Sequence, residues 1–177
     1  DVARARCWES VAQRWTRALQ GVAWDGGWFR RAFFDDGQVL GSHAGIEARI
    51  DLIAQAWAVL SGVAALPAQR LAMAAARALL ADPGAGLMRL LDPPLAHAEP
   101  SAGYIQAYPP GVRENGGQYA HAAVWALMAQ ARLHRSAAEA DLVYRDFTWL
   151  SPAHRAADPS WGRSEEHTSE LQSHACI

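Results

Sequence analysis

The residue types best suited to chemistry lie together in one short segment, residues 103–123. Arg113 and Glu114 form an adjacent pair of opposite charges, a glycine pair follows, and His121 comes shortly after. Arginine offers an anion a planar, permanently charged fork of donors, and an imidazole can donate a hydrogen bond to the same anion. This combination indicates a site for an anionic ligand.

The backbone of this segment is expected to present these side chains to the ligand. The two prolines and the glycine of residues 109–111 disfavour a regular helix, so residues 104–111 are predicted to form a stiff, extended approach. Asn115 is predicted to cap a helix that begins near Gly116, where glycine lets the backbone come close to a ligand. The free N–H groups and positive potential of such a helix start suit phosphate.

Two segments of the chain resemble glycoside hydrolase family 94, the cellobiose and chitobiose phosphorylase family. Residues 109–121, PPGVRENGGQYAH, are similar to its PPG(V/I)(R/K)ENGG motif and the histidine that follows. Residues 24–62 contain WDGGWFRRAFFDDGQVLGS and IAQAWAVLSG, which resemble its WDG-W-RAFDDG-GS stretch and IAQ-WAVLSG helix. Within the family, the chain is most similar to the phosphorylase-like C-terminal domain of cyclic β-1,2-glucan synthases.

The resemblance implies an enzyme that cleaves β-glucosides, with β-1,2-glucan as the expected substrate and a sugar 1-phosphate as the product. In an inverting phosphorylase, inorganic phosphate attacks the anomeric carbon while a carboxylic acid protonates the leaving oxygen. By resemblance, His121 binds phosphate, and Arg113 and Glu114 line the sugar site. The expected partners are therefore a carbohydrate and phosphate, with phosphate as a substrate and no cofactor or metal.

Each candidate residue also has a purely structural interpretation. Arg113 and Glu114 can form an ion pair that shapes the loop, and a histidine on an apolar helix can belong to the core. Asp36, together with Asp35, is a candidate for contacting sugar hydroxyls, but an Asp-Gly pair is equally typical of a turn. Trp57 shares helical spacing with nearby isoleucines, which favours core packing.

The family's catalytic acid lies in a DWND-type motif, and this motif does not occur in the chain. The Thr-Gly phosphate-binding segment of the family is absent as well. The sequence is therefore expected to be a fragment that lacks its general acid and is inactive alone. Two alternatives remain open: an inverting hydrolase on the same scaffold with Glu114 as general base, and a noncatalytic α-helical carbohydrate-binding module.

Composition narrows the classes of partner. The chain has 177 residues, is 51% hydrophobic and carries a net charge of -2, which favours a folded domain and gives no electrostatic case for nucleic acid or an anionic membrane. No apolar run is a convincing membrane span. The two cysteines, Cys7 and Cys176, do not have the spacing of a disulfide framework, so a reduced, cytoplasmic location is expected. The alternative is that the parent protein is a membrane-attached glucan synthase.

Hydrophobic periodicity predicts an all-α chain. The helices are expected at residues 2–19, 46–61, 66–80, 119–133 and 137–150, with Ser136 as the cap of the last and a short strand within 87–91. The resemblance implies that residues 1–162 are part of an (α/α)6 barrel. Residues 163–177, RSEEHTSELQSHACI, look like a translated sequencing adapter and are set aside as non-native, including the metal site that their histidines and glutamates would suggest.

Overall fold

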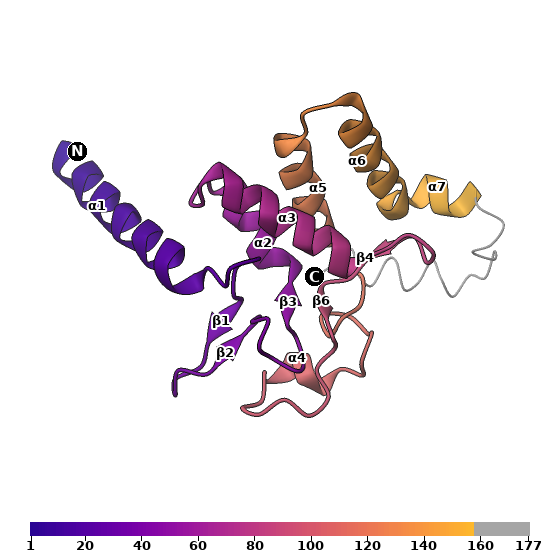
Figure 1. Cartoon of the computed structure of the whole chain (residues 1–177), viewed down its shortest axis with the longest axis horizontal. Coiled ribbons are helices and arrows are strands. Elements are labelled where there is room, and N and C mark those ends of the chain that lie inside the picture. Colours follow the sequence, from indigo (N-terminus) through magenta and orange to yellow (C-terminus); the bar gives the residue numbers. More distant parts are fainter. Residues whose placement is uncertain (158–177) are drawn as a thin grey trace.

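Helices account for most of residues 1–157, which are the residues that the computed structural model describes (Figure 1). The predicted mostly helical class is confirmed, whereas the (α/α)6 barrel stays a prediction and the tail at 163–177 lies outside the described residues. The helices are α1 (Val2–Ala18), α2 (Leu52–Leu60), α3 (Leu66–Leu80), α4 (Tyr104–Ala107), α5 (Ala120–Leu133), α6 (Ala137–Leu150) and α7 (Pro152–Ala157), with a π-helical turn, η1 (Leu19–Ala23), after α1.

Short antiparallel strand pairs connect the helices. The pairs are β1 (Ala32–Phe33) with β2 (Val39–Leu40), β3 (Ile50–Asp51) with β6 (Leu91–Asp92), and β4 (Ala81–Asp82) with β5 (Leu87–Met88). The strand predicted within residues 87–91 is thus divided between β5 and β6, which pair with different partners. Through the β3–β6 pair, the segment 24–62 forms backbone hydrogen bonds with the residues that precede the segment 103–123.

The helix boundaries follow from capping. α3 and α6 have the predicted bounds, and the Ser136 side chain accepts the Glu139 N–H at 3.2 Å as the cap of α6. α2 begins at Leu52 rather than at residue 46, so that prediction is wrong. The reason is Asp51, whose carboxylate accepts the N–H groups of Ile53 and Ala54 at 2.8 and 3.2 Å and caps the helix there.

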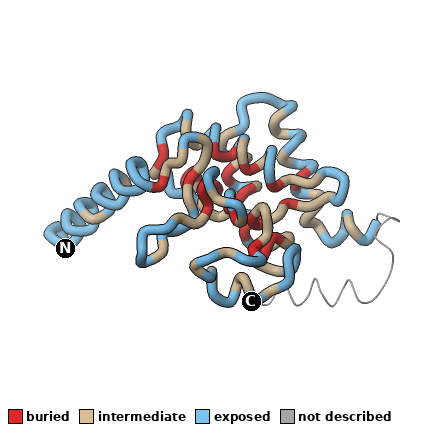
Figure 2. The backbone as a smooth tube through the Cα atoms, turned by 60° about the horizontal axis from the view of Figure 1, so that its bottom comes forward, coloured by how far each residue is buried: buried red, intermediate tan, exposed pale blue. Residues whose placement is uncertain are grey.

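The main core lies where α2, α3 and α5 meet, and the buried residues gather there in Figure 2. α5 contributes only alanines to its buried face, and small side chains let neighbouring helices approach closely. α2 and α3 contribute larger apolar side chains to the same cluster. The buried members from these three helices are Leu52, Ala56, Val59, Met73, Ala76, Leu80, Ala122, Ala123, Ala126 and Ala129.

Two apolar surfaces remain uncovered. α1 has no buried residue and projects away from the body of the molecule, with Trp8 64% and Trp15 62% exposed (Figure 1). The apolar side chains of α1 are therefore largely uncovered in residues 1–157. Trp57 on α2 is 44% exposed, so its assignment to the core is wrong. In residues 1–157, none of the helices has the length and apolar character needed to cross a membrane.

Candidate functional site

The loop before α5 is built around Asn115, which is fully buried. Its side-chain amide donates to the carbonyl oxygens of Leu95 and Tyr108 at 2.7 and 2.8 Å, and its side-chain oxygen accepts the Leu95 N–H at 2.7 Å. The prediction that Asn115 caps a helix near Gly116 is therefore wrong, because its side chain bonds the backbone of Leu95 and Tyr108 instead. The helix begins four residues later, at Ala120.

The two glycines serve close packing within the chain. Gly116 has a φ of +86°, and a Cβ atom placed there would lie 2.8 Å from Cγ of Pro94. A Cβ on Gly117 would lie 2.8 Å from the carbonyl oxygen of Arg113. Side chains at these positions would therefore clash with the protein itself. The glycines were predicted to let the backbone approach a ligand, but Gly116 instead lets it approach Pro94 in the proline-rich loop.

The approach to this loop is also shorter and more folded than predicted. Residues 104–107 form α4, a single helical turn. Tyr108 is extended, and the Val112 N–H then donates to the Pro109 carbonyl oxygen at 3.0 Å and closes a turn. The prolines act after this turn, not within it, so they end the helix instead of preventing it. The extended approach predicted for residues 104–111 is therefore wrong, because a helical turn and a second turn replace most of it.

Arg113 and Glu114 lie at the tip of the loop and contact each other. Nε of Arg113 is 3.8 Å from Oε2 of Glu114, and the guanidinium lies 5.1 Å from the centre of the Tyr108 ring. The Arg113 side chain is 34% exposed and that of Glu114 15%. Oε2 of Glu114 is buried and has no hydrogen bond, so this oxygen can still accept one from a ligand.

His121 lies in the first turn of α5 and is exposed. Tyr119 precedes the helix without a side-chain cap, so the first N–H groups of α5 have no capping acceptor. The His121 imidazole makes ring contacts but no hydrogen bond within residues 1–157. A helix start with free donors and an unbonded imidazole is an arrangement that can hold an anion.

The first motif segment is organised by Asp25, a residue that the sequence analysis did not single out. One carboxylate oxygen accepts from Nε and Nη2 of Arg30 at 3.0 and 2.7 Å. The other accepts from the Ser42 hydroxyl at 3.0 Å and from the His43 N–H at 2.7 Å, and it lies 2.6 Å from Nδ1 of His43. The sequence signal available for Asp25 is its place in the WDGG motif, between a tryptophan and two glycines.

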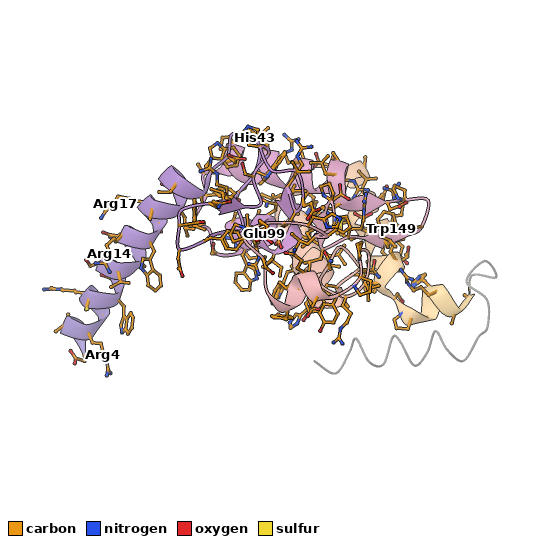
Figure 3. The ribbon with its side chains drawn as sticks, turned by 90° about the horizontal axis from the view of Figure 1, so that it is seen from below. Arg4, Arg14, Arg17, His43, Glu99 and Trp149 are labelled. Atoms are coloured by element: carbon orange, nitrogen blue, oxygen red, sulfur yellow. The ribbon has the colours of Figure 1, made fainter. Side chains whose placement is uncertain are left out.

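These contacts fix the charge of Asp25. Burial raises the pKa of its carboxyl, but the donors from His43, Arg30 and Ser42 together outweigh burial and lower the pKa to about 2. The Asp25 side chain is 1% exposed, whereas His43 lies at the surface (Figure 3). Asp25 therefore ties two loops together as a buried, fully bonded anion.

Gln55 and Asp51 extend the same network into α2. The fully buried Gln55 side chain accepts the Phe29 N–H at 2.7 Å and donates to the carbonyl oxygens of Phe29 and Asp51 at 2.8 and 2.9 Å. Arg31 lies 3.3 Å from the Asp51 carboxylate. Burial is the main influence on that carboxyl and raises its pKa, although Arg31 and the capped N–H groups oppose the shift.

Asp36 lies at the exposed turn between β1 and β2. Its carboxylate accepts the N–H and the side-chain amide of Gln38, both at 2.9 Å, as expected for the turn interpretation. Within residues 1–157, no hydrogen bond or ion pair joins Asp36 to Arg113, Glu114 or His121. The same residues contain no cluster of three or more side chains of the types that bind metals.

Residues 1–167 match the catalytic domain of the glycosyl hydrolase 94 superfamily. The chain therefore belongs to this family, and the resemblance found in its two motif segments is confirmed.

Its relatives include a glucan synthase and several phosphorylases. Cyclic beta-(1,2)-glucan synthase NdvB of Rhizobium meliloti is 44% identical over 88% of this chain and 5% of that protein. A 3-O-beta-D-glucopyranosyl-beta-D-glucuronide phosphorylase of Paenibacillus borealis is 35% identical over 73% of this chain and 16% of that protein. An N,N'-diacetylchitobiose phosphorylase of Vibrio furnissii is 30% identical over 76% of this chain and 17% of that protein. The chain thus spans a small part of the length of each relative.

Proposed function

We propose that this chain forms the sugar- and phosphate-binding part of an inverting glycoside phosphorylase domain. The observation that carries the proposal is the pair of unsatisfied groups in the second motif segment. Glu114 keeps a buried oxygen without a hydrogen bond, and the His121 imidazole has none within the described chain. Buried polar groups are normally bonded, so the unbonded Glu114 oxygen favours a ligand site.

His121 and the start of α5 are proposed to bind inorganic phosphate. The uncapped N–H groups supply donors and positive potential, and the imidazole adds a directed donor from the first turn. Phosphate held in this way can attack the anomeric carbon of the sugar. This anion site takes the place of the general base and water of an inverting hydrolase.

Glu114 and Arg113 are proposed to bind the sugar. A carboxylate can accept hydrogen bonds from two adjacent hydroxyls, which orients a sugar ring, and the Arg113 guanidinium lies next to that carboxylate. Asp36 is proposed as a further sugar contact at the β1–β2 turn. The 44% identity to a cyclic β-(1,2)-glucan synthase supports a β-1,2-glucan as the substrate.

The proton donor is proposed to be a residue outside this chain. The helices are proposed to form part of an (α/α)6 barrel. No carboxylate of the described residues is given the role of general acid. The Asp25 carboxylate is the centre of a hydrogen-bond network, and the Asp51 carboxylate caps α2, so both make structural contacts. The chain alone is therefore expected to show no phosphorolysis.

The test uses the complete family domain that contains this segment. It is incubated with β-1,2-glucan with and without phosphate, and sugar 1-phosphate and free sugar are measured. Formation of sugar 1-phosphate that requires phosphate is the expected result. Equal sugar release without phosphate would favour the hydrolase with Glu114 as general base, and no release in either condition would favour a noncatalytic module.

Two variants test the residue assignments in the same assay. His121→Ala should raise the KM for phosphate at least tenfold, whereas the exposed His97→Ala should leave it unchanged. Glu114→Gln should raise the KM for the glucan and leave the KM for phosphate close to that of the wild type. An unaltered phosphate KM in His121→Ala would remove His121 from the phosphate site.

A further inference from the structure

The His121 ring is held by other aromatic side chains. Its centre lies 4.5 Å from that of the Trp125 ring at an angle of 38°, and 6.3 Å from that of Tyr119 at 28°. Trp125 follows His121 by one helical turn, so both side chains lie on the same face of α5. These ring contacts, not hydrogen bonds, therefore set the orientation of the imidazole within residues 1–157.

Trp125 is itself supported from a second helix. It is partly buried against the main core, and its ring meets that of Trp57 on α2 at 5.3 Å and 73°, an edge-to-face contact. The contacts thus run from α2 through Trp57 and Trp125 to His121. An exposed histidine with several rotamers open to it is in this way connected to the rigid part of the fold.

We propose that Trp125 is a positioning residue for phosphate, which acts by fixing the His121 imidazole over the start of α5. This inference rests on the proposed function of His121. A hydrogen bond to phosphate depends strongly on the direction of its donor, so a freely rotating imidazole binds more weakly than one that is already oriented. The indole needs no contact with the ligand to have this effect.

The main test is the kinetics of Trp125 variants in the complete family domain. Trp125→Leu should raise the KM for phosphate about tenfold and change kcat less than about twofold. The variant lets the His121 imidazole rotate in the free enzyme, but the imidazole can still adopt the same orientation once phosphate is bound. Trp125→Phe keeps a planar ring and should restore most of the phosphate affinity. Trp149→Leu, which removes a partly buried tryptophan from α6, is the matched control and should not alter the KM.

A double variant separates positioning from general structural damage. If Trp125 acts through His121, then His121→Ala with Trp125→Leu should bind phosphate no more weakly than His121→Ala alone. Additive losses would overturn the inference, and so would equal losses in Trp125→Leu and Trp125→Phe. If His121→Ala raises the phosphate KM but Trp125→Leu does not, the inference fails and the proposed function stands. If His121→Ala has no effect, the proposed function fails.

A measurement on the 177-residue chain tests the contact without catalysis. The indole ring current should shift the NMR signals of the carbon-bound protons of the His121 imidazole, and Trp125→Leu should move them toward the values of a free histidine. The signals of His97 serve as the internal control. Unchanged His121 signals in Trp125→Leu would contradict the ring contact, and with it the inference.

Discussion

The two motif segments differ in how fully their candidate polar side chains are bonded. In residues 24–62, Asp25 and Gln55 are buried and every contact they make is with the protein. In residues 103–123, Glu114 keeps an unbonded oxygen and His121 has only ring contacts within the described chain. The first segment therefore builds the framework, whereas the second, apart from its buried Asn115, leaves polar side chains without hydrogen-bond partners in residues 1–157.

The largest effect on stability is expected from removing the centre of the framework segment. Asp25→Ala leaves Arg30 without its carboxylate and frees the Ser42 and His43 donors, which should cost about 3–5 kcal/mol of the free energy of unfolding. Urea unfolding of the chain measures this loss. Asp35→Ala, at an exposed position in the same segment, should change stability by less than about 0.5 kcal/mol. Comparable losses in the two variants would refute the framework role.

A pH dependence follows from the lowered pKa of Asp25. Its folded pKa is about 2 against an ordinary aspartate value of 3.8, so the ionised form is favoured by folding. The resulting stabilisation, about 2 kcal/mol, is fully present above roughly pH 4 and is lost as the pH falls through 2. Urea unfolding between pH 5 and 2 should show this loss in the wild type and a smaller one in Asp25→Asn. Parallel curves for the two proteins would rule out Asp25 as the titrating group.

Alanine substitutions at two glycines should separate the stability cost of backbone strain from that of a steric clash. Gly26 and Gly116 have the same φ of +86°, but a Cβ on Gly26 would meet nothing within 4 Å, whereas one on Gly116 would meet Pro94. Gly26→Ala should therefore cost about 1 kcal/mol for its conformation alone. Gly116→Ala should cost about 2 kcal/mol or more, because it adds the clash with Pro94. Equal losses in urea unfolding would show that the proline loop moves aside.

The smallest effect on stability is expected in the second motif segment, residues 103–123. His121→Ala removes an exposed ring without a hydrogen bond in the described chain, so the free energy of unfolding should change by less than about 0.5 kcal/mol. The same variant is expected to have the large effect on the KM for phosphate described above. A loss of stability above 1 kcal/mol would instead place His121 in the framework.

Local signals in the sequence predicted the helices well where packing and capping agree. α3 and α6 have their predicted bounds because apolar periodicity, Pro67 near the start of α3 and the Ser136 cap all act within a few residues. α2 was predicted too long, because the residues before and including its Asp51 cap pair as β3 with β6, a contact between residues about forty positions apart.

The candidate site was predicted in its residue types but not in its backbone. Arg113, Glu114 and His121 were selected by motif resemblance. The helix cap assigned to Asn115 was wrong because its partners, Leu95 and Tyr108, lie outside its local sequence. The hub role of Asp25 was missed for the same reason, since Ser42 and His43 reach it from another loop.

Because α1 projects from the body of the molecule, its helical conformation depends mainly on its own local interactions. A helix of this length is only marginally stable in water on its own, and none of its residues is buried, so core packing adds little to it. Its backbone amides should therefore exchange with solvent much faster than those of α2 and α5, and its exposed arginines, among them Arg14 and Arg17, offer trypsin its first cleavage sites (Figure 3). Whatever surface covers Trp8 and Trp15 would then also be what keeps α1 folded.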